Sequence, residues 1–194
     1  MRRIILPIAT LSALAAFAVT ATAQTTRVTP GFEVRSFAGA FVPTGDQRND
    51  FKTATMLGAQ VAHEFSEHLH LLGSFAWTHG HNKFANLNDD RTFIWQYDAG
   101  VELNLVREIN DDWLFRPLVV VGVGARTYDY AAAGVGSNTC SAGYASVGSE
   151  LQRGTVAVRL DARDYLNCFK SPFTGVKKTR NDMGLTLGLV YHIR

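Results

Sequence analysis

The sequence has no surplus of charge of either sign once its first 23 residues are set aside. It contains 19 Lys plus Arg and 17 Asp plus Glu, and two of the basic residues are Arg2 and Arg3. The remaining chain is formally neutral, so it lacks the basic excess typical of proteins that bind nucleic acids. Beyond these residues it also lacks any apolar stretch long enough to cross a membrane as a helix. We therefore expect neither a nucleic-acid partner nor a helical membrane span.

The start of the chain has the pattern of a secretory signal peptide. Arg2 and Arg3 precede an apolar run from Ile4 to Val19, and the small residues Ala21-Thr22-Ala23 close it. We predict cleavage after Ala23, so that residues 1–23 are a cleaved signal peptide and residues 24–194 form one domain. A membrane helix is the weaker alternative, because small residues rather than a second basic flank end the run.

Apolar and polar residues alternate along most of the remaining chain. In residues 93–105, Phe93, Trp95 and Val101 fall on one face and Asp98 on the other, because successive side chains of a strand point to opposite sides. Such a length suits a strand that crosses a bilayer at a tilt. The alternation predicts eight strands, at about 31–42, 52–65, 69–79, 92–106, 112–129, 142–152, 155–167 and 181–193.

The connections between these strands alternate in length. Those at 66–68, 107–111 and 153–154 are short, whereas those at 43–51, 80–91, 130–141 and 168–180 are long and polar. Short turns on one side and long loops on the other are typical of an outer-membrane barrel. The pattern predicts an all-β fold, an eight-stranded antiparallel up-and-down transmembrane β-barrel with short periplasmic turns and longer extracellular loops.

Aromatic residues gather near the predicted strand ends, as two girdles at the two membrane interfaces would. We assign Trp77, Phe93, Trp95 and Tyr165 to the girdle at the long loops. The girdle at the short turns would contain Phe65, Trp113, Phe115 and Tyr191.

The polar faces of the strands carry acids and arginines in nearly equal number. Burying them in a soluble core would be costly, whereas in a barrel lumen they could pair with one another. An eight-stranded lumen is just wide enough for side chains to fill, so we expect no open channel. The predicted lumen charge network is Glu33, Arg35, Glu64, Asp98, Glu102, Arg116, Arg126, Glu150, Arg159, Asp161 and Arg163.

Turn lengths predict two cross-strand pairs. A three-residue turn at 66–68 sets Glu64 opposite His70. A five-residue turn at 107–111 sets Glu102 opposite Arg116, and we predict an ion pair between these two in the lumen.

With these features the mature chain resembles the small outer-membrane β-barrel family of OmpA/OmpX type. The last strand adds a local motif, because Thr186, Gly188, Tyr191 and Ile193 resemble the C-terminal signal that the barrel assembly machinery recognises in such proteins. The family usually ends on an aromatic residue, whereas here Arg194 follows Ile193. The resemblance implies the assembly machinery, periplasmic chaperones and outer-membrane lipids as partners.

The only two cysteines lie beside one predicted hairpin. Cys140 precedes the strand at 142–152 and Cys168 follows the strand at 155–167. A two-residue turn at 153–154 sets position 140 opposite 167, one residue from direct pairing, which a bulge would accommodate. We predict a disulfide in this exported protein, with two free thiols as the alternative.

Histidines and serines offer weak signals for chemistry. His68/His70 and His79/His81 are spaced to share a strand face, yet each pair lacks an obvious third metal ligand, so we predict no metal site and no cofactor. Ser74 and His79 fall on opposite faces, and no G-x-S-x-G elbow occurs, so we predict no catalytic residues.

We therefore expect an integral outer-membrane protein, not an enzyme, with a structural or surface-interaction role. Three alternatives remain open: a narrow pore, a lipid-modifying outer-membrane enzyme, and a soluble lipocalin-like barrel with its greasy residues inside.

Overall fold

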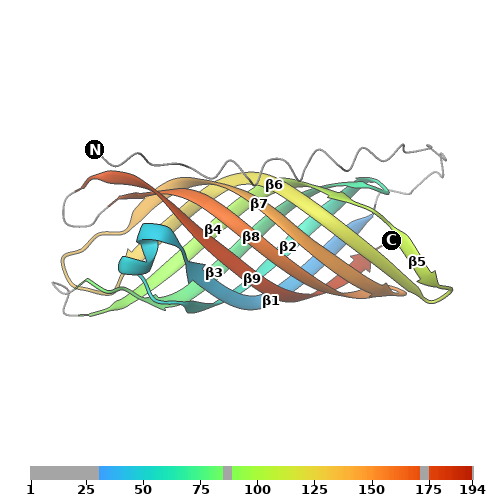
Figure 1. Ribbon diagram of the computed structural model, residues 1–194, viewed down its shortest axis with the longest axis horizontal. Coiled ribbons are helices and arrows are strands. Elements are labelled where there is room, and N and C mark those ends of the chain that lie inside the picture. Colours follow the sequence, from blue (N-terminus) through green and yellow to red (C-terminus); the bar gives the residue numbers. More distant parts are fainter. Residues whose placement is uncertain (1–30, 85–88, 171–174, 194) are drawn as a thin grey trace.

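The computed structural model describes residues 31–84, 89–170 and 175–193, so the predicted signal peptide lies outside the described residues. Most of the described chain is strand, and it contains one short 3-10 helix (Figure 1). The elements are β1 (Phe32–Pro43), η3 (Gly45–Asn49), β2 (Ala54–Ser66), β3 (Leu69–His81), β4 (Arg91–Asn104), β5 (Arg107–Asn110), β6 (Trp113–Tyr130), β7 (Asn138–Arg153), β8 (Val156–Lys170) and β9 (Lys177–Ile193). Among them, no helix is long and apolar enough to cross a bilayer.

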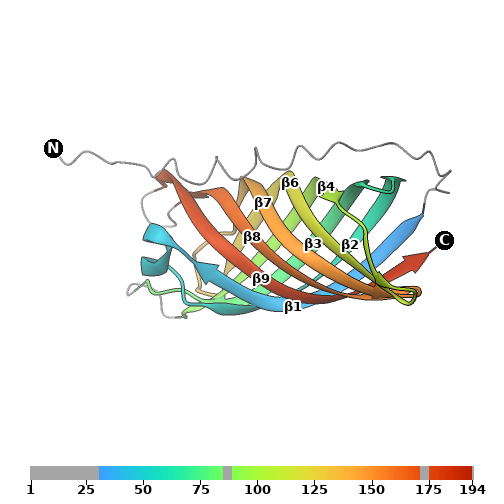
Figure 2. The same cartoon turned by 45° about the vertical axis from the view of Figure 1, so that its right-hand side comes forward.

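The strands close into an eight-stranded antiparallel barrel. Strands that follow one another in the chain pair, except β4 and β5, and β1 pairs with β9, from Phe32 opposite Ile193 to Pro43 opposite Asp182. β4 pairs with β6, and the short β5 continues the line of β4 along the same partner. The wall surrounds a narrow lumen, with η3 at one end and β5 at the other (Figures 1 and 2). The predicted fold class is confirmed.

The faces of the wall are apolar outside and polar inside. On β9, Leu185, Leu187 and Leu189 are 48–59% exposed, whereas Thr186 and His192 are 4% and 3% exposed. A continuous apolar exterior would be unfavourable in water and is expected where the wall contacts lipid. The lipocalin-like alternative is therefore wrong, because it requires the opposite polarity.

Pro117 lies within β6, where a proline removes one donor from the ladder. Its carbonyl accepts a hydrogen bond from Leu105 N at 3.0 Å, opposite the gap between β4 and β5. The interruption of the partner strand thus falls beside the residue that cannot donate.

Strands β7, β8 and β9 reach further toward the long connections than the alternation predicts. β7 begins at Asn138, β8 ends at Lys170 and β9 begins at Lys177. These extra residues are mostly polar, so their hydrophobic pattern does not distinguish them from loop.

Two of the turns differ from those predicted. Arg107–Asn110 form β5 rather than loop, and the chain reverses between Asn110 and Trp113. The hairpin between β7 and β8 turns at Gly154 and Thr155, between the paired Arg153 and Val156. Gly154 has φ +60°, a backbone conformation that glycine adopts without steric penalty.

The position of an exposed apolar residue on the wall predicts how much an introduced charge would destabilise the barrel, and two residues allow this to be tested. Leu187 is 58% exposed and pairs with Ala38 and Leu160, whereas Ile109 is 60% exposed beside the turn after β5. Leu187→Arg would place a charge within the lipid-facing wall and lower the free energy of unfolding by about 2–4 kcal/mol, and Ile109→Arg by about 0–1 kcal/mol. Denaturant unfolding in lipid vesicles measures both, and equal losses would contradict the assigned membrane position.

Candidate functional site: the closed lumen

One carboxylate in the lumen is shared between two arginines. Glu102 on β4 accepts two hydrogen bonds from Arg35 on β1, at 2.8 and 2.9 Å, and one from Arg159 on β8 at 2.7 Å. Glu102 is 1% exposed, Arg35 2% and Arg159 4%. Bidentate contact by a guanidinium is the strongest form of such pairing, so this cluster ties three separated strands together.

The eleven predicted lumen charges all face the interior. Glu33, Arg35, Asp98, Glu102, Arg126, Glu150, Arg159, Asp161 and Arg163 are buried, and Glu64 and Arg116 are half-buried. The alternation of side chains along each strand is enough to predict this orientation, because residues two apart share a face.

The predicted ion pair between Glu102 and Arg116 is wrong. Glu102 lies opposite Val120, because the β5 extension moves the turn toward the C-terminus. Arg116 instead lies 3.7 Å from Glu33 and 3.8 Å from Glu150. The observed register of β4 and β6 differs from the predicted one by an even number of residues. Both side chains therefore still face the lumen, although they do not pair with each other. The predicted pairing of Glu64 with His70 is confirmed.

A second polar cluster lies nearer the long connections. Arg126 on β6 pairs with Asp182 on β9, and Asn167 on β8 donates to Asp182 at 2.7 Å. The Arg126 guanidinium stacks over the Tyr165 ring, 4.7 Å from its centre. The sequence analysis did not include Asp182 in the lumen charge network, although Asp182 lies on the same face of β9 as Thr186 and His192.

Tyr165 does not belong to the girdle at the long loops. It is 1% exposed and its hydroxyl donates to Asp98 across the lumen at 3.0 Å. Tyr165 is separated from Arg159, Asp161 and Arg163 by even numbers of residues, so it shares their inward face of β8. It therefore points into the lumen, although it lies at the level of the girdle along the strand. The other girdle residues face outward: Trp77, Phe93, Trp95, Phe65, Trp113, Phe115 and Tyr191.

The outward aromatics near the long loops gather on two adjacent strands. Trp77 on β3 lies 6.3 Å from Phe93 and 6.2 Å from Trp95, both on β4, and Phe75 stacks on Trp95 at 5.8 Å. They form a patch on β3 and β4.

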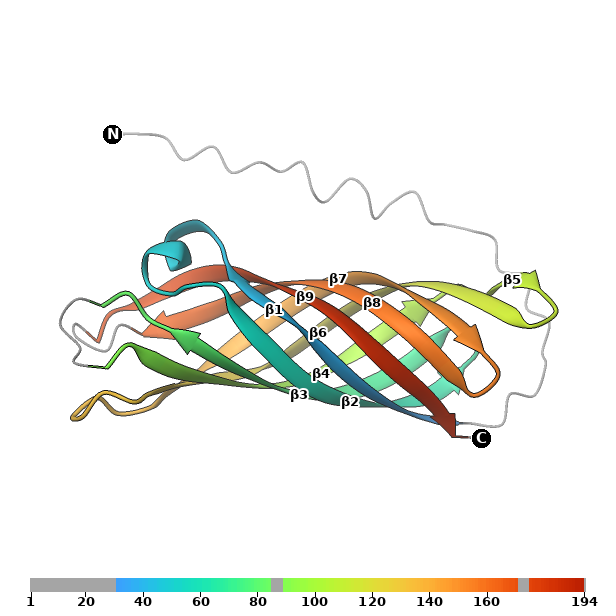
Figure 3. The same cartoon turned by 90° about the horizontal axis from the view of Figure 1, so that it is seen from below.

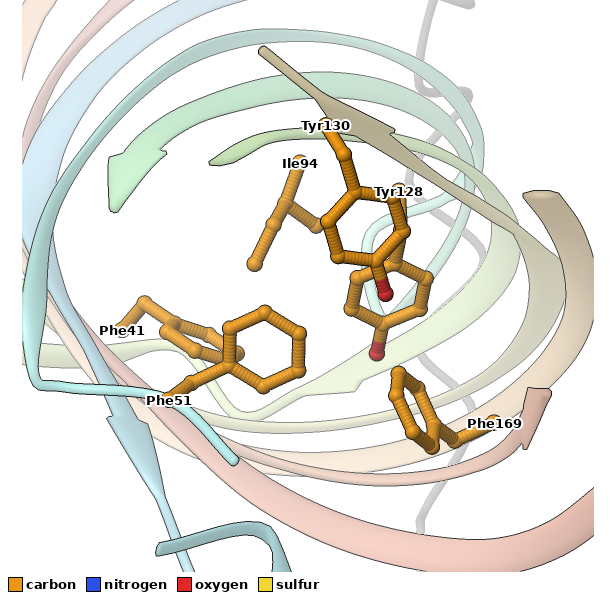
Figure 4. Packing of buried hydrophobic residues seen from close by; sticks show 6 residues of the cluster. All are labelled: Phe41, Phe51, Ile94, Tyr128, Tyr130 and Phe169. Carbon is orange, nitrogen blue, oxygen red and sulfur yellow. The ribbon is translucent and has the colours of Figure 1, made fainter. Parts of the chain in front are cut away.

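An aromatic cluster, which we call the cap, closes the lumen at the end that carries η3. Figure 4 shows its buried residues turned toward one another inside the wall: Phe41, Phe51, Ile94, Tyr128, Tyr130 and Phe169. Phe51 stacks on Tyr128 at 5.5 Å, and Gln47 of η3 donates to the Tyr128 hydroxyl at 3.2 Å. Sequence reasoning missed the cap, because Phe51 lies in a predicted loop.

The two cysteines form a disulfide, with Cα atoms 5.5 Å apart. Ala142 pairs with Asn167, and extending this register by two residues puts Cys140 opposite Phe169. The cysteines are therefore one residue out of direct pairing, as expected. The predicted partner of position 140, residue 167, is wrong. The bond joins the ends of β7 and β8 nearest the cap.

The histidine pairs are separated or lie at the rim. His68 is exposed in a turn while His70 is buried in the lumen, so these two do not share a site. His79 and His81 stack at 5.9 Å, and His81 Nδ1 lies 3.0 Å from Asp90, where this hydrogen bond holds the pKa of Asp90 below its usual value. Ser74 donates to Asp98 inside the lumen at 3.3 Å, away from the outward His79.

The residues of the C-terminal motif are divided between the two faces of β9. Thr186 is buried in the lumen, whereas Tyr191 and Ile193 are 54% and 47% exposed on the outer wall.

A closed wall that is apolar outside and ionised inside defines an integral β-barrel membrane protein. The chain belongs to the family of the outer membrane protein beta-barrel domain, whose model matches residues 9–193. The match begins within the segment predicted as a signal peptide.

Solved structures share the fold at low sequence identity. Neisserial surface protein A (NspA) is 11% identical with a TM-score of 0.64, over 84% of this chain and 99% of that one. The N-terminal β-barrel domain of Pseudomonas aeruginosa OprF is 13% identical with a TM-score of 0.53, over 84% and 97%. No curated protein sequence matches the chain closely enough to count as a relative.

The position of Glu102 between two buried arginines predicts that removing its charge would greatly lower the free energy of unfolding. Glu102→Gln would leave Arg35 and Arg159 without their shared carboxylate in a buried site, and we expect a loss of about 3–5 kcal/mol in the free energy of unfolding. The control is Asp112→Asn, since Asp112 and Arg153 form an exposed pair at 3.7 Å, worth at most about 1 kcal/mol. Denaturant unfolding measures both, and similar losses would refute a structural role for the network.

Proposed function

We propose that this protein is a closed outer-membrane barrel with a structural or surface-interaction role, delivered by the connections at the capped end. The main observation behind this proposal is that two groups of side chains fill the lumen. One is the ion network around Glu102, and the other is the cap. A filled lumen leaves the outer connections as the part of the molecule free to contact other molecules.

Export and assembly complete the proposal. The signal peptide at 1–23 would direct the chain out of the cytoplasm, and residues 186–193 would present the assembly signal to the barrel assembly machinery. The apolar wall supports outer-membrane lipids as its immediate surroundings.

We propose a non-enzymatic role over a lipid-modifying one. Ser74 is engaged with Asp98 in the lumen, whereas His79 stacks on the outer wall with Trp77 and Phe93. A nucleophile and its base must lie within hydrogen-bonding reach, which this arrangement does not provide. Deacylation of lipid A by membranes containing the protein would favour the enzyme instead.

The filled lumen predicts no ion conduction. Purified protein in planar bilayers should give no stable open steps, because charged and aromatic side chains occupy the interior. The double variant Arg35→Ala/Glu102→Ala removes both members of the central pair and is expected to show more frequent openings than wild type. Stable steps from wild-type protein would favour the narrow pore.

The proposed orientation predicts one-sided labelling. Gly136 lies in the long connection between β6 and β7, and Asp112 lies in the turn between β5 and β6 at the other end. A membrane-impermeant maleimide on intact cells should label Gly136→Cys, and should label Asp112→Cys only after the outer membrane is permeabilised. The wild-type chain, with its cysteines in a disulfide, is the unlabelled control. Labelling of Asp112→Cys alone on intact cells would reverse the orientation.

A further inference from the structure

We propose that Glu33, Glu64 and His192 form a binding site for one divalent transition-metal ion of the zinc class. The three side chains come from the neighbouring strands β1, β2 and β9, at the end of the lumen opposite the cap. One ligand atom from each lies within 4.8 Å of the other two, and among the described residues no other three His, Cys, Asp or Glu side chains group in this way.

The spacing of the ligand atoms suits a tetrahedral ion. His192 Nδ1 lies 3.1 Å from Glu33 Oε1 and 3.9 Å from Glu64 Oε1. Ligand atoms about 2.0–2.2 Å from a tetrahedral zinc ion lie about 3.3–3.6 Å from one another. The observed distances bracket this range, so a small movement of Glu64 would complete the geometry.

Two of the ligand atoms lack hydrogen bonds despite their burial. Glu33 Oε1 and His192 Nδ1 make none within the described residues, although only 3.1 Å separates them, and the two residues are 0% and 3% exposed. A buried polar atom without a partner is destabilising, so each such atom calls for an explanation. A cation between them would satisfy both.

Glu150 is placed to orient the imidazole once an ion is bound, since among the described residues neither His192 Nε2 nor Glu150 Oε1 makes a hydrogen bond. His192 Nε2 lies 3.3 Å from Glu150 Oε1. A metal-binding histidine commonly donates its second ring N–H to a carboxylate, which fixes the ring and its tautomer. With the proton on Nε2, the lone pair of Nδ1 points toward Glu33 and Glu64, and three electron-pair donors then face one another.

The local charge balance also favours a cation. Glu33, Glu102 and Glu150 each lie within 4.0 Å of at least one arginine, whereas within the described part of the chain Glu64 has His192 as its charged neighbour. Arg116 opposes the ion, because its Nη1 lies 3.7 Å from Glu33 Oε1. That opposition gives the experiment a variant expected to strengthen binding.

The ligand types select the class of metal. One imidazole with two carboxylates suits zinc and its neighbours better than calcium or magnesium, which prefer all-oxygen sites. Three protein ligands leave a fourth position for water. Glu64 is the most exposed ligand at 17%, so the ion would enter from the short-turn end.

The test is calorimetric titration of the refolded full barrel with zinc chloride after removal of metal by a chelator. His79→Ala/His81→Ala serves as the background, because it removes the histidine pair at the rim. We expect one zinc ion per chain in this background, binding weakened about tenfold or more on adding Glu64→Gln, and tighter binding on adding Arg116→Gln. Heat-dependent gel migration verifies that each variant is folded.

Several results would overturn the site. These are no zinc binding in the background chain, unchanged affinity in folded Glu64→Gln, or equal affinity in all three chains. If no zinc binds, a protonated His192 rather than a metal ion would be the cation that pairs with the carboxylates of Glu33 and Glu64. If Glu64→Gln does not fold, the Arg116→Gln chain decides, because removal of an arginine 3.7 Å from Glu33 should tighten the binding of a cation at the site, and unchanged or weaker binding would overturn it.

Discussion

The closed ladder of the wall is the constraint on which the rest of the molecule depends. In lipid, each backbone N–H and C=O must find its partner within the protein, and a sheet without edges achieves this. The outer face must then be apolar where it meets lipid, so the charged residues at these levels of the wall are directed inward. A lumen of eight strands is just wide enough for side chains to fill, and the inward charges pair with one another there. Glu102, between Arg35 and Arg159, is the centre of that arrangement.

The interior has two layers that differ in chemistry. Ion pairs connect β1, β4 and β8 across the lumen, whereas aromatic stacking closes the end that carries η3. Phe51 and Gln47 come from the connection between β1 and β2, so the cap fastens part of an outer loop to the barrel. The surface proposed for interaction is thereby attached to the rigid part of the fold.

Much of the fold follows from the sequence, because a period of two specifies both the strands and their faces. The lumen charges from Glu33 to Arg163 were found this way. Three features were not. The polar ends of β7, β8 and β9 carry no apolar alternation. The β4–β6 register depends on a turn whose length the sequence of residues 107–111 does not fix. The cap depends on Phe51, a loop residue that only tertiary packing brings into the lumen.

The metal site shows a different limit. Glu33, Glu64 and His192 are far apart in the chain, and their proximity exists only once β1 has paired on both sides. The regular spacing of His79 and His81 in the sequence lies instead at the rim, where the sequence offers no third ligand. Parity would have placed His192 in the lumen, yet it could not have shown which of the inward carboxylates it meets.

Phe32, the first residue of β1, pairs with Ile193, the last residue of β9, so the first and last strands are neighbours in the wall (Figure 3). No hairpin can complete this seam locally, so the barrel remains an open sheet until the final strand is in place. A chain cut short before β9 would keep two unpaired edges in a hydrophobic setting, where such edges associate with other chains. Closure of the wall therefore depends on β9 being present to pair with both β8 and β1.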